Sequence, residues 1–409
     1  MSLEFNYYSL GDLVKIKYGK NQKKVQDDEN GKYPIYGTGG LMGYSIDYLY
    51  DKPSVLIGRK GSIEKVRYIE EPFWTVDTLF YTEVNDKIVI PKFLYYVMSL
   101  INLSRYNEGT SIPSLRTETL NRLDLPIPNL DYQKRVLTVL SNIDKKISLN
   151  KKINKNLDNL LMSIFNSWFI NFEVYDKSNG MKFDETFGDV PRLWSVEMLE
   201  DYVDFVTGVE PGSKNYHEKP EINDIPFIRV GDLGSRINTV FIDKLLSKNK
   251  ILSPDDITLS LDATVGIVKM GLNGAYSTGM RKLLIKNDDI NKPFLYCLVK
   301  SKRIQRIIET FATGTTILHA GKSIKHMNFV LSDEQTMNQF GKIGNPILSI
   351  ILANLKEINK LTKLRDTLLP KLMSGEIDVS KINCDLELKY NYMKYLFNQI
   401  HTPMSKSVV

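Results

Sequence analysis

The chain has 409 residues, which is enough for two or three domains of about 150 residues each. Its 42% hydrophobic and 25% charged residues are ordinary for a soluble globular protein and exclude collagen-like, mucin-like and largely disordered chains. The amino terminus lacks the pattern of a secretory signal, and no apolar run reaches the ~18 residues of a membrane-spanning helix. Cys297 and Cys384 are too few for a disulfide framework, so a cytoplasmic location is expected. Because no membrane-spanning segment is predicted, no membrane association is expected.

The net charge of +6 is unevenly distributed along the chain. Residues 131–170 hold seven basic and three acidic side chains, whereas residues 1–130 and 171–330 are each neutral. Overall charge is therefore a weak indicator of nucleic-acid binding, and any such surface must come from local clustering on a neutral body.

The sequence pattern of residues 1–130 is typical of short strands separated by glycine-rich turns, with a helical segment at 91–103. Residues 171–330 show the same pattern, with a helical segment at 292–311 and a connecting segment at 171–199. We therefore expect two small mixed α/β domains.

Residues 131–170 contain no proline or glycine and carry apolar residues or asparagines at alternating steps of four and three. This spacing is typical of a coiled-coil seam, and polar residues such as Asn150 and Asn154 within a seam can fix its register. The predicted seam positions include Leu140, Ile143, Ile147, Asn150, Asn154, Leu157 and Leu161.

Residues 331–409 contain a second stripe with the same spacing, which Pro370 and Gly375 are expected to end. Its predicted seam positions are Ile343, Ile347, Ile350, Asn354, Leu361, Leu364 and Leu368. Periodicity alone is also compatible with two helices of one bundle core, but we favour an antiparallel pair of long helices that acts as a spacer.

The two blocks repeat each other in order along the chain. Leu10, Asp12, Val14 and Gly19 recur as Leu199, Asp201, Val203 and Gly208; further pairs are Phe93-Leu-Tyr with Phe294-Leu-Tyr, Gly109-Thr-Ser-Ile with Gly314-Thr-Thr-Ile, and Asp131-Tyr-Gln with Asp333-Glu-Gln. Because the order is kept while the offset drifts, a two-copy internal repeat with loops of different length is the simplest interpretation.

The sequence offers little for catalysis. Gly321-Lys322-Ser323 lacks the upstream glycine spacing of a phosphate-binding loop, and the four histidines and two cysteines give no plausible zinc set. We expect no catalytic, cofactor-binding or metal-binding residues, and interpret the chain as a binding protein rather than an enzyme.

Basic residues beside aromatic, hydroxyl and glycine residues are the candidate DNA contacts, because phosphates accept hydrogen bonds from Lys, Arg, Ser and Thr. A solvated surface explains most lysine clusters, but the paired Gly-Thr loops favour a functional role. The candidates are Lys20, Lys23, Lys24, Arg59, Lys60, Thr110, Ser111 and Arg116 in the first block, and Lys214, Arg281, Lys282, Thr315, Thr316, His319, Lys322 and Lys325 in the second.

Two longer motifs resemble those of the type I restriction–modification specificity (S) subunits. Leu364-Arg-Asp-Thr-Leu-Leu-Pro-Lys-Leu-Met-Ser-Gly-Glu-Ile-Asp378 resembles the end of that family's distal helix. Ser167-Trp-Phe-Ile-Asn-Phe-Glu173, followed by Phe187-Gly-Asp-Val-Pro-Arg-Leu-Trp194, resembles its passage from the central helix to the second recognition domain.

The resemblance implies an α/β (mixed α+β) fold with two target recognition domains separated by two antiparallel coiled-coil helices in a pseudo-twofold repeat. Target recognition domain 1 would span 1–130, the central helix 131–170, domain 2 171–330, and the distal helix and tail 331–409. The seam residues above would form the spacer and the docking site for partners.

The resemblance also implies a subunit without catalytic activity of its own. Each domain would read one half of a bipartite, asymmetric sequence in double-stranded DNA. Two methyltransferase (modification) subunits and the restriction/translocase subunits would be the partners, and S-adenosylmethionine, ATP and Mg²⁺ would bind to those partners. The alternatives are a coiled-coil adaptor without sequence-specific DNA binding and, with the weakest support, an enzyme that uses a degenerate nucleotide loop.

Overall fold

The computed structural model describes residues 5–234, 240–314, 318–377 and 379. The chain folds into two compact units, each assembled from separate parts of the sequence. Unit 1 comprises residues 1–146 and 361–409, and unit 2 comprises residues 147–360. Each unit therefore contains one block of the repeat together with a segment of both long helices.

Unit 1 is built on an antiparallel sheet of order β2-β8-β5-β6 and a smaller sheet of order β4-β3-β7, while β1 pairs with β9. Its strands are β1 Phe5–Ser9, β2 Val14–Tyr18, β3 Tyr33–Gly37, β4 Gly40–Ser45, β5 Ser54–Gly58, β6 Val66–Ile69, β7 Trp74–Thr75, β8 Leu79–Val84 and β9 Asp124–Pro128. Its short helices are α1 Leu10–Leu13, α2 Pro91–Ser99, the 3₁₀ turn Leu103–Tyr106 and α3 Thr117–Asn121.

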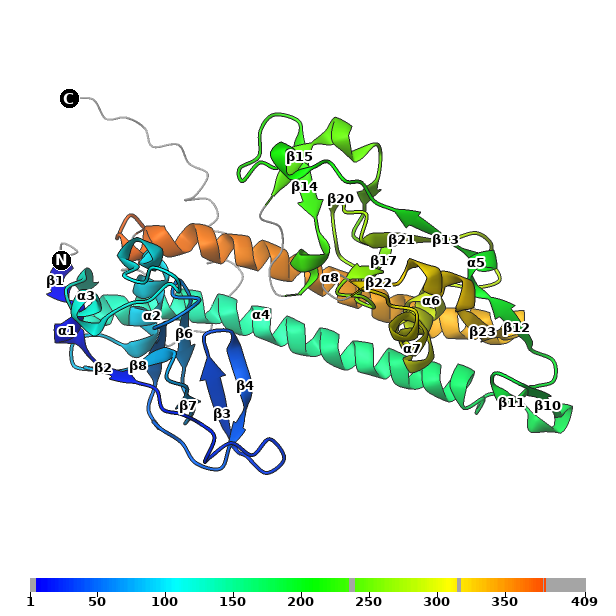
Figure 1. Ribbon diagram of the computed structural model, residues 1–409, viewed down its shortest axis with the longest axis horizontal. Helices are drawn as coiled ribbons and strands as arrows, with labels where there is room; N and C mark the ends of the chain where they lie inside the picture. The colour runs from blue at the N-terminus through cyan, green and yellow to red at the C-terminus, as the bar shows by residue number, and fades with distance from the viewer. Residues whose placement is uncertain (1–4, 235–239, 315–317, 378, 380–409) are drawn as a thin grey trace. The chain divides into compact units, whose positions relative to one another are not determined.

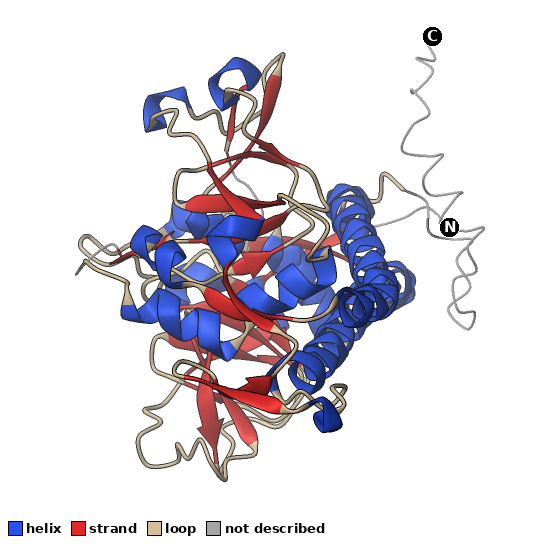
Figure 2. Cartoon of the chain, turned by 90° about the vertical axis from the view of Figure 1, so that its right-hand side faces the viewer, coloured by secondary structure: helices blue, strands red, loops and turns tan. Residues whose placement is uncertain are grey.

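Unit 2 repeats this plan, with a sheet of order β13-β21-β17-β19, a second sheet of order β15-β14-β20-β16, and the pair β12–β23. Its strands are β10 Met181–Asp184, β11 Gly188–Pro191, β12 Ser195–Met198, β13 Val203–Thr207, β14 Asp224–Ile228, β15 Phe241–Asp243, β16 Ile251–Leu252, β17 Ile257–Ser260, β18 Asp262–Ala263, β19 Val268–Lys269, β20 Gly274–Tyr276, β21 Met280–Ile285, β22 Leu318–His319 and β23 Asn328–Leu331. Its short helices are α5 Leu199–Tyr202, α6 Lys292–Lys300 and α7 Lys302–Thr310, with 3₁₀ turns at Lys177–Asn179, Ser213–Asn215, Val230–Leu233, Lys244–Ser247 and Gly321–His326. Both units combine short strands with short helices, as the sequence predicts (Figure 2).

The repeated glycines occupy matching positions where the backbone is crowded. A Cβ atom on Gly19 would lie 2.0 Å from the carbonyl oxygen of Val76, and one on Gly208 would lie 2.1 Å from that of Tyr276. Only glycine fits at such a close approach of two backbone segments. The repeated glycine therefore reflects a steric requirement that both units share.

Two long helices carry the predicted seams. Helix α4 spans Leu130–Phe165 and continues as a π-helix over Asn166–Ile170, and α8 spans Glu334–Met373 (Figure 1). The helices run antiparallel within each unit. In unit 1 the Tyr132 hydroxyl donates to the Leu372 carbonyl, and in unit 2 Asn154 bonds Asn354.

The asparagines predicted to fix the register lie in the seam of unit 2. The Asn150 side chain, only 1% exposed, donates to Glu357 Oε2 at 2.7 Å. Asn354 Nδ2 donates to Asn154 Oδ1 at 2.8 Å, and Asn154 Nδ2 donates to the Ile351 carbonyl at 3.1 Å. These bonds form in one alignment of the helices only, which is how polar seam residues specify register.

The structure corrects three local predictions. Helix α8 continues through Pro370 to Met373, and the chain turns at Gly375, whose φ is +77°. The segment at 292–311 forms two helices, because Ser301 is extended and its side chain caps the start of α7. The residue that caps α8 is Asp333, but the residue that caps α4 is Asn129 and not Asp131. The sequence match of Asp131-Tyr-Gln with Asp333-Glu-Gln therefore does not align the starts of the two helices.

A cluster of aromatic side chains forms the core of unit 2 where α4, α6 and α8 meet. The Phe169 ring packs against Phe294 at a centroid distance of 4.8 Å and against Phe340 at 5.1 Å. Trp194 is buried beside it and donates from Nε1 to Asp333 at 2.9 Å. The segment that follows α4 is thus anchored into the core of unit 2 by burial of apolar area.

Candidate nucleic-acid interface

One end of the main sheet in unit 1 gathers many of the predicted DNA-contacting residues. Strands β2 and β5 end there and β8 begins there, because Tyr18 and Ile57 both lie opposite Phe80. The residues that leave these strands, Lys20 after β2 and Arg59 and Lys60 after β5, therefore emerge at the same edge.

The Arg59 side chain is held at this edge by three contacts. Its guanidinium carbon lies 5.1 Å from the centroid of the Tyr18 ring, and Nη1 donates to the Asp77 carbonyl at 2.9 Å. The Arg59 amide donates to the Thr78 carbonyl at 2.8 Å. The Tyr18 side chain is 51% exposed, so a cation and an aromatic face are presented to solvent together.

The loop Gly109–Arg116 is hydrogen-bonded onto the same edge. The Leu115 amide donates to the Arg59 carbonyl, Gly61 donates to Pro113, and Lys60 forms an isolated β-bridge with Ser114. Thr110 and Ser111 are exposed on this loop. We refer to the exposed residues Tyr18, Lys20, Lys60, Thr110 and Ser111, together with the partly buried Arg59, as edge surface 1.

The other candidates in unit 1 lie near this surface with different environments. Lys23 and Lys24 are exposed in the turn that follows Lys20. Arg116 pairs with Glu108 at 3.1 Å and its side chain is 69% exposed. Arg116 therefore presents a guanidinium whose charge is already partly neutralised.

Unit 2 builds the corresponding edge with different side chains. Strand β22 pairs with β18, and the Ala320 amide donates to the Leu261 carbonyl as Leu115 does to Arg59 in unit 1. His319 Nδ1 lies 2.7 Å from Asp262 Oδ1, where unit 1 has Ser114 beside Lys60. Both units therefore attach the loop before the final strand to the end of a central strand.

Arg281 lies at the centre of this second edge, on β21 between β13 and β17. Its Nη1 donates to the carbonyls of Thr278 and Met280 at 2.5 and 3.1 Å, and burial lowers the pKa of its guanidinium. Lys322 and Lys325 are exposed on the 3₁₀ turn that follows His319. We refer to Asp262, Arg281, His319, Lys322 and Lys325 as edge surface 2.

Two predicted contacts, Lys282 and Lys214, do not join edge surface 2. Lys282 pairs with Asp256 at 2.7 Å and its side chain is 21% exposed. Lys214 is exposed on a separate 3₁₀ turn after β13. Thr315 and Thr316 lie outside the described residues.

Several residues with suitable chemistry escaped the sequence analysis. Leu41, Met42 and Tyr44 are exposed on β4. Arg229 bonds Asp232 through Nε and Nη2 at 3.0 Å and lies 5.9 Å from the Tyr216 ring centroid.

Most of the predicted seam residues are buried in the helix pairs. Leu140, Ile143, Ile147, Asn150, Leu161, Ile347 and Leu368 are buried, while Asn154, Leu157, Asn354, Leu361 and Leu364 are partly buried. Ile343 and Ile350 are instead 39% and 48% exposed; beside Ile350, the inward-facing position of α8 is its neighbour Ile351. In the described part of the chain, no helix is long and apolar enough to cross a membrane.

The chain belongs to the family described as "Type I restriction modification DNA specificity domain", whose sequence profile matches residues 3–159 and 191–336. The two matches coincide with the internal repeat. The fold and the family match thus define a two-domain DNA-specificity protein.

Among the relatives, the type I restriction enzyme MjaIX specificity subunit of Methanocaldococcus jannaschii is 27% identical over 354 residues, which cover 82% of this chain and 80% of that protein. The HindI specificity subunit of Haemophilus influenzae is 24% identical over 375 residues, covering 74% and 81%. The crystal structure of the S subunit from M. genitalium, at 20% identity, matches with a TM-score of 0.55 over 91% of this chain and 96% of that one. This structural match confirms the fold.

Proposed function

We propose that this chain is the DNA-specificity subunit of a type I restriction–modification complex, with edge surfaces 1 and 2 each reading one half of a bipartite, asymmetric site in double-stranded DNA. The observation that carries the proposal is the duplicated edge, at which a loop is hydrogen-bonded to the end of a central strand in both units. Two similar but chemically different surfaces are what recognition of two unlike half-sites requires.

The side chains on the two surfaces suit two kinds of DNA contact. Lys20, Lys60, Thr110 and Ser111 are exposed donors for phosphate oxygens. Arg59 and Arg281 present planar guanidinium groups, which can bind guanine bidentately in the major groove. The recognition blocks are nearly neutral, so a share of the phosphate contacts would come from partner subunits that close around the duplex.

The catalytic steps would belong to the partners. Two methyltransferase subunits would bind S-adenosylmethionine, and restriction/translocase subunits would bind ATP and Mg²⁺. In the described residues no group of three His, Cys, Asp or Glu side chains is placed to hold a metal ion. The proposed role of this chain is therefore to bind DNA and to position the enzymes.

The long helices offer apolar side chains for docking of those partners. Leu149 and Leu160 on α4 and Ile343 and Ile350 on α8 are exposed, although most other apolar residues of these helices are buried or partly buried. These four residues belong to unit 2. Apolar residues that remain exposed along a helix are a usual site for association with another helix.

The test is to co-purify the chain with its methyltransferase partner and to map the methylated positions in host DNA by sequencing. The expected result is one motif composed of two short specific parts separated by a spacer of fixed length and free sequence. A contiguous motif, or no motif, would contradict the proposal. The coiled-coil adaptor alternative predicts no DNA affinity even with partners present.

A further inference from the structure

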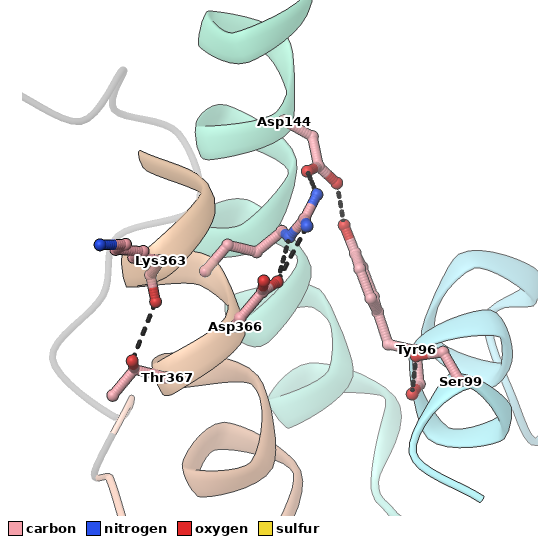
Figure 3. Close-up of polar contacts among 7 residues, drawn as sticks. Tyr96, Ser99, Asp144, Lys363, Asp366 and Thr367 are labelled. Atoms are coloured by element: carbon pink, nitrogen blue, oxygen red, sulfur yellow. Dashed lines mark hydrogen bonds and ion pairs between the residues drawn. The ribbon is translucent and has the colours of Figure 1, made fainter. Parts of the chain in front are cut away.

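A cluster of polar side chains joins the recognition domain of unit 1 to both long helices. The Tyr96 hydroxyl on α2 donates to Asp144 on α4, and Arg365 Nη1 on α8 donates to the other Asp144 oxygen at 3.1 Å (Figure 3). Arg365 also donates from Nε and Nη2 to Asp366 at 3.0 and 2.8 Å. One carboxylate thus receives hydrogen bonds from the recognition domain and from the opposite helix.

Unit 2 contains a cluster of the same chemistry. The Tyr296 hydroxyl on α6 donates to Asp158 Oδ1 on α4 at 2.8 Å, and Lys300 Nζ donates to the two Asp158 oxygens at 2.5 and 2.6 Å. Lys300 Nζ also lies 4.5 Å from the centroid of the Tyr296 ring. A tyrosine of a recognition-domain helix, an aspartate of α4 and a cation therefore meet in each unit.

The two clusters do not occupy equivalent positions of the repeat. The sequence repeat pairs Tyr296 with Tyr95, whereas the donor to α4 in unit 1 is Tyr96. The cation comes from α8 in unit 1 and from α6 in unit 2. Duplication of one ancestral cluster does not explain why the tyrosine and the cation come from different positions. The difference indicates that each unit needs a polar bond between its domain and α4, and makes that bond with different residues.

The tyrosines suit such a role because their rings are buried and their hydroxyls remain donors. Tyr96 is 3% and Tyr296 is 9% exposed. Burial, together with the neighbouring carboxylate, raises the pKa of both hydroxyls. The aspartates are only partly exposed, and the paired cation offsets the cost of their desolvation.

A directional bond of this kind fixes the position of a domain along the helix, which apolar packing alone does not fix. A heptad stripe presents similar apolar side chains at every turn, so a domain packed on it alone can shift by a turn, ~5.4 Å, with little change in buried area. The tyrosine–aspartate bond forms in one position only. A shift of one turn exceeds the ~3.4 Å rise of a DNA base pair, so it would change the spacing that the protein reads.

We propose that Tyr96, Asp144 and Arg365 in unit 1, and Tyr296, Asp158 and Lys300 in unit 2, are positioning residues that fix each recognition domain on α4 and thereby narrow the range of spacer lengths accepted. This inference rests on the proposed function, because it assigns the range of spacer lengths that the protein accepts in a bipartite site to named residues.

The test compares duplexes in which the two half-sites found by methylation mapping are separated by the natural spacer or by one base pair more or fewer. Binding and methylation are measured for the full chain with its methyltransferase partner. The variants are Tyr96→Phe, Tyr296→Phe and the double variant, which keep the ring and remove the hydroxyl. Tyr95→Phe is the matched control, because in the described residues no hydrogen bond of the Tyr95 hydroxyl to another residue is present.

The expected result for Tyr96→Phe and for Tyr296→Phe is a loss of about tenfold in discrimination against the altered spacers, with base discrimination within each half-site unchanged. Tyr95→Phe should keep the wild-type discrimination. An unchanged spacer preference in the double variant, or an equal loss of affinity on all duplexes, would overturn the inference. If the wild-type complex has no split site at all, the proposed function itself fails.

Discussion

At the scale of single residues, the repeat preserves positions that backbone geometry requires and varies those that face solvent. Gly19 and Gly208 correspond because a Cβ atom on either residue would lie about 2 Å from a backbone carbonyl oxygen. By contrast, Lys60 in unit 1 corresponds to Asp262 in unit 2 at the edge surfaces. Shared residues therefore reflect the requirements of the fold, and the differing residues at the edge surfaces are those to which we assign target specificity.

Gly208→Ala is expected to destabilise the protein by about 1–3 kcal/mol, because the Tyr276 carbonyl belongs to the backbone and cannot move aside for the added methyl group. Chemical unfolding measures the change. Gly231→Ala is the matched control, since nothing lies within 4 Å of its Cβ position. Equal stability of the two variants would refute the steric explanation of the repeated glycine.

Lys60→Ala is expected to weaken DNA binding and to lower the slope of log affinity against log salt by about one, as loss of a single phosphate contact does. The control is Lys87→Ala, an exposed lysine just beyond the carboxyl end of β8, whereas edge surface 1 lies where β8 begins. A salt slope that falls for Lys87→Ala and not for Lys60→Ala would place the DNA contact elsewhere.

His217 makes the stability of unit 2 depend on pH. Its Nδ1 lies 2.6 Å from Asp224, a hydrogen bond that raises the pKa of His217 above 6.5, while the bond from the Glu221 amide, followed by that from His217, lowers the pKa of Asp224 below 3.8. The contribution of His217 is therefore complete below pH 6.5 and is lost as the pH rises through its raised pKa. Wild type should exceed His217→Gln in unfolding free energy at pH 5.5, and the difference should shrink by pH 8.5; a difference that grows with pH would contradict this sign.

At the scale of elements, the long helices combine apolar burial with a few polar bonds that select one alignment. Most of the heptad positions are buried, which supplies the affinity between α4 and α8 within each unit. The asparagine pair supplies the alignment, because an apolar stripe by itself tolerates a shift by one heptad. The tyrosine–aspartate clusters extend the same principle to the contact between helix and recognition domain.

Asn154→Leu and Asn354→Leu are each expected to destabilise unit 2 by about 1–3 kcal/mol, because each removes the bond from Asn354 Nδ2 to Asn154 Oδ1 and leaves the other half-buried asparagine without that partner. The double variant should recover most of this loss, since both polar groups are then gone. Urea unfolding of the four proteins gives the coupling energy. Additive losses would mean that the two asparagines do not act as a pair.

At the scale of the whole molecule, both long helices continue without a break from one compact unit into the other. Helix α4 passes from unit 1 to unit 2 between Lys146 and Ile147, and α8 returns between Lys360 and Leu361. The proposed spacer therefore depends on two helices whose lengths must change together.

Insertion of one heptad after Lys146 and one before Leu361 is expected to lengthen the DNA spacer by about three base pairs. Seven helical residues add ~10.5 Å, and the rise of B-DNA is ~3.4 Å per base pair. Methylation mapping of the variant complex measures the spacer. A heptad inserted into α4 alone should abolish activity through mispairing with α8, and an unchanged spacer in the matched variant would refute the proposed role of the helices.

The sequence by itself determined the mixed α/β class, the two-copy plan and the two long helices, because heptad spacing and repeated motifs are local signals that one chain displays in full. It misjudged α8 at Pro370, where the helix continues, and the segment around Ser301, where a capping bond ends one helix and begins the next. Both outcomes depend on bonds and packing that residue spacing does not encode.

Only the tertiary structure decided which candidate residues share a surface. Arg59 and the loop Gly109–Arg116 are some fifty residues apart in the sequence, and backbone hydrogen bonds bring them to one edge. Lys282 adjoins Arg281 in sequence, yet it pairs with Asp256 because neighbouring residues of a strand point to opposite faces. Long-range pairing and side-chain direction are properties of the folded chain, which is why the basic clusters could be proposed from the sequence but not assembled from it.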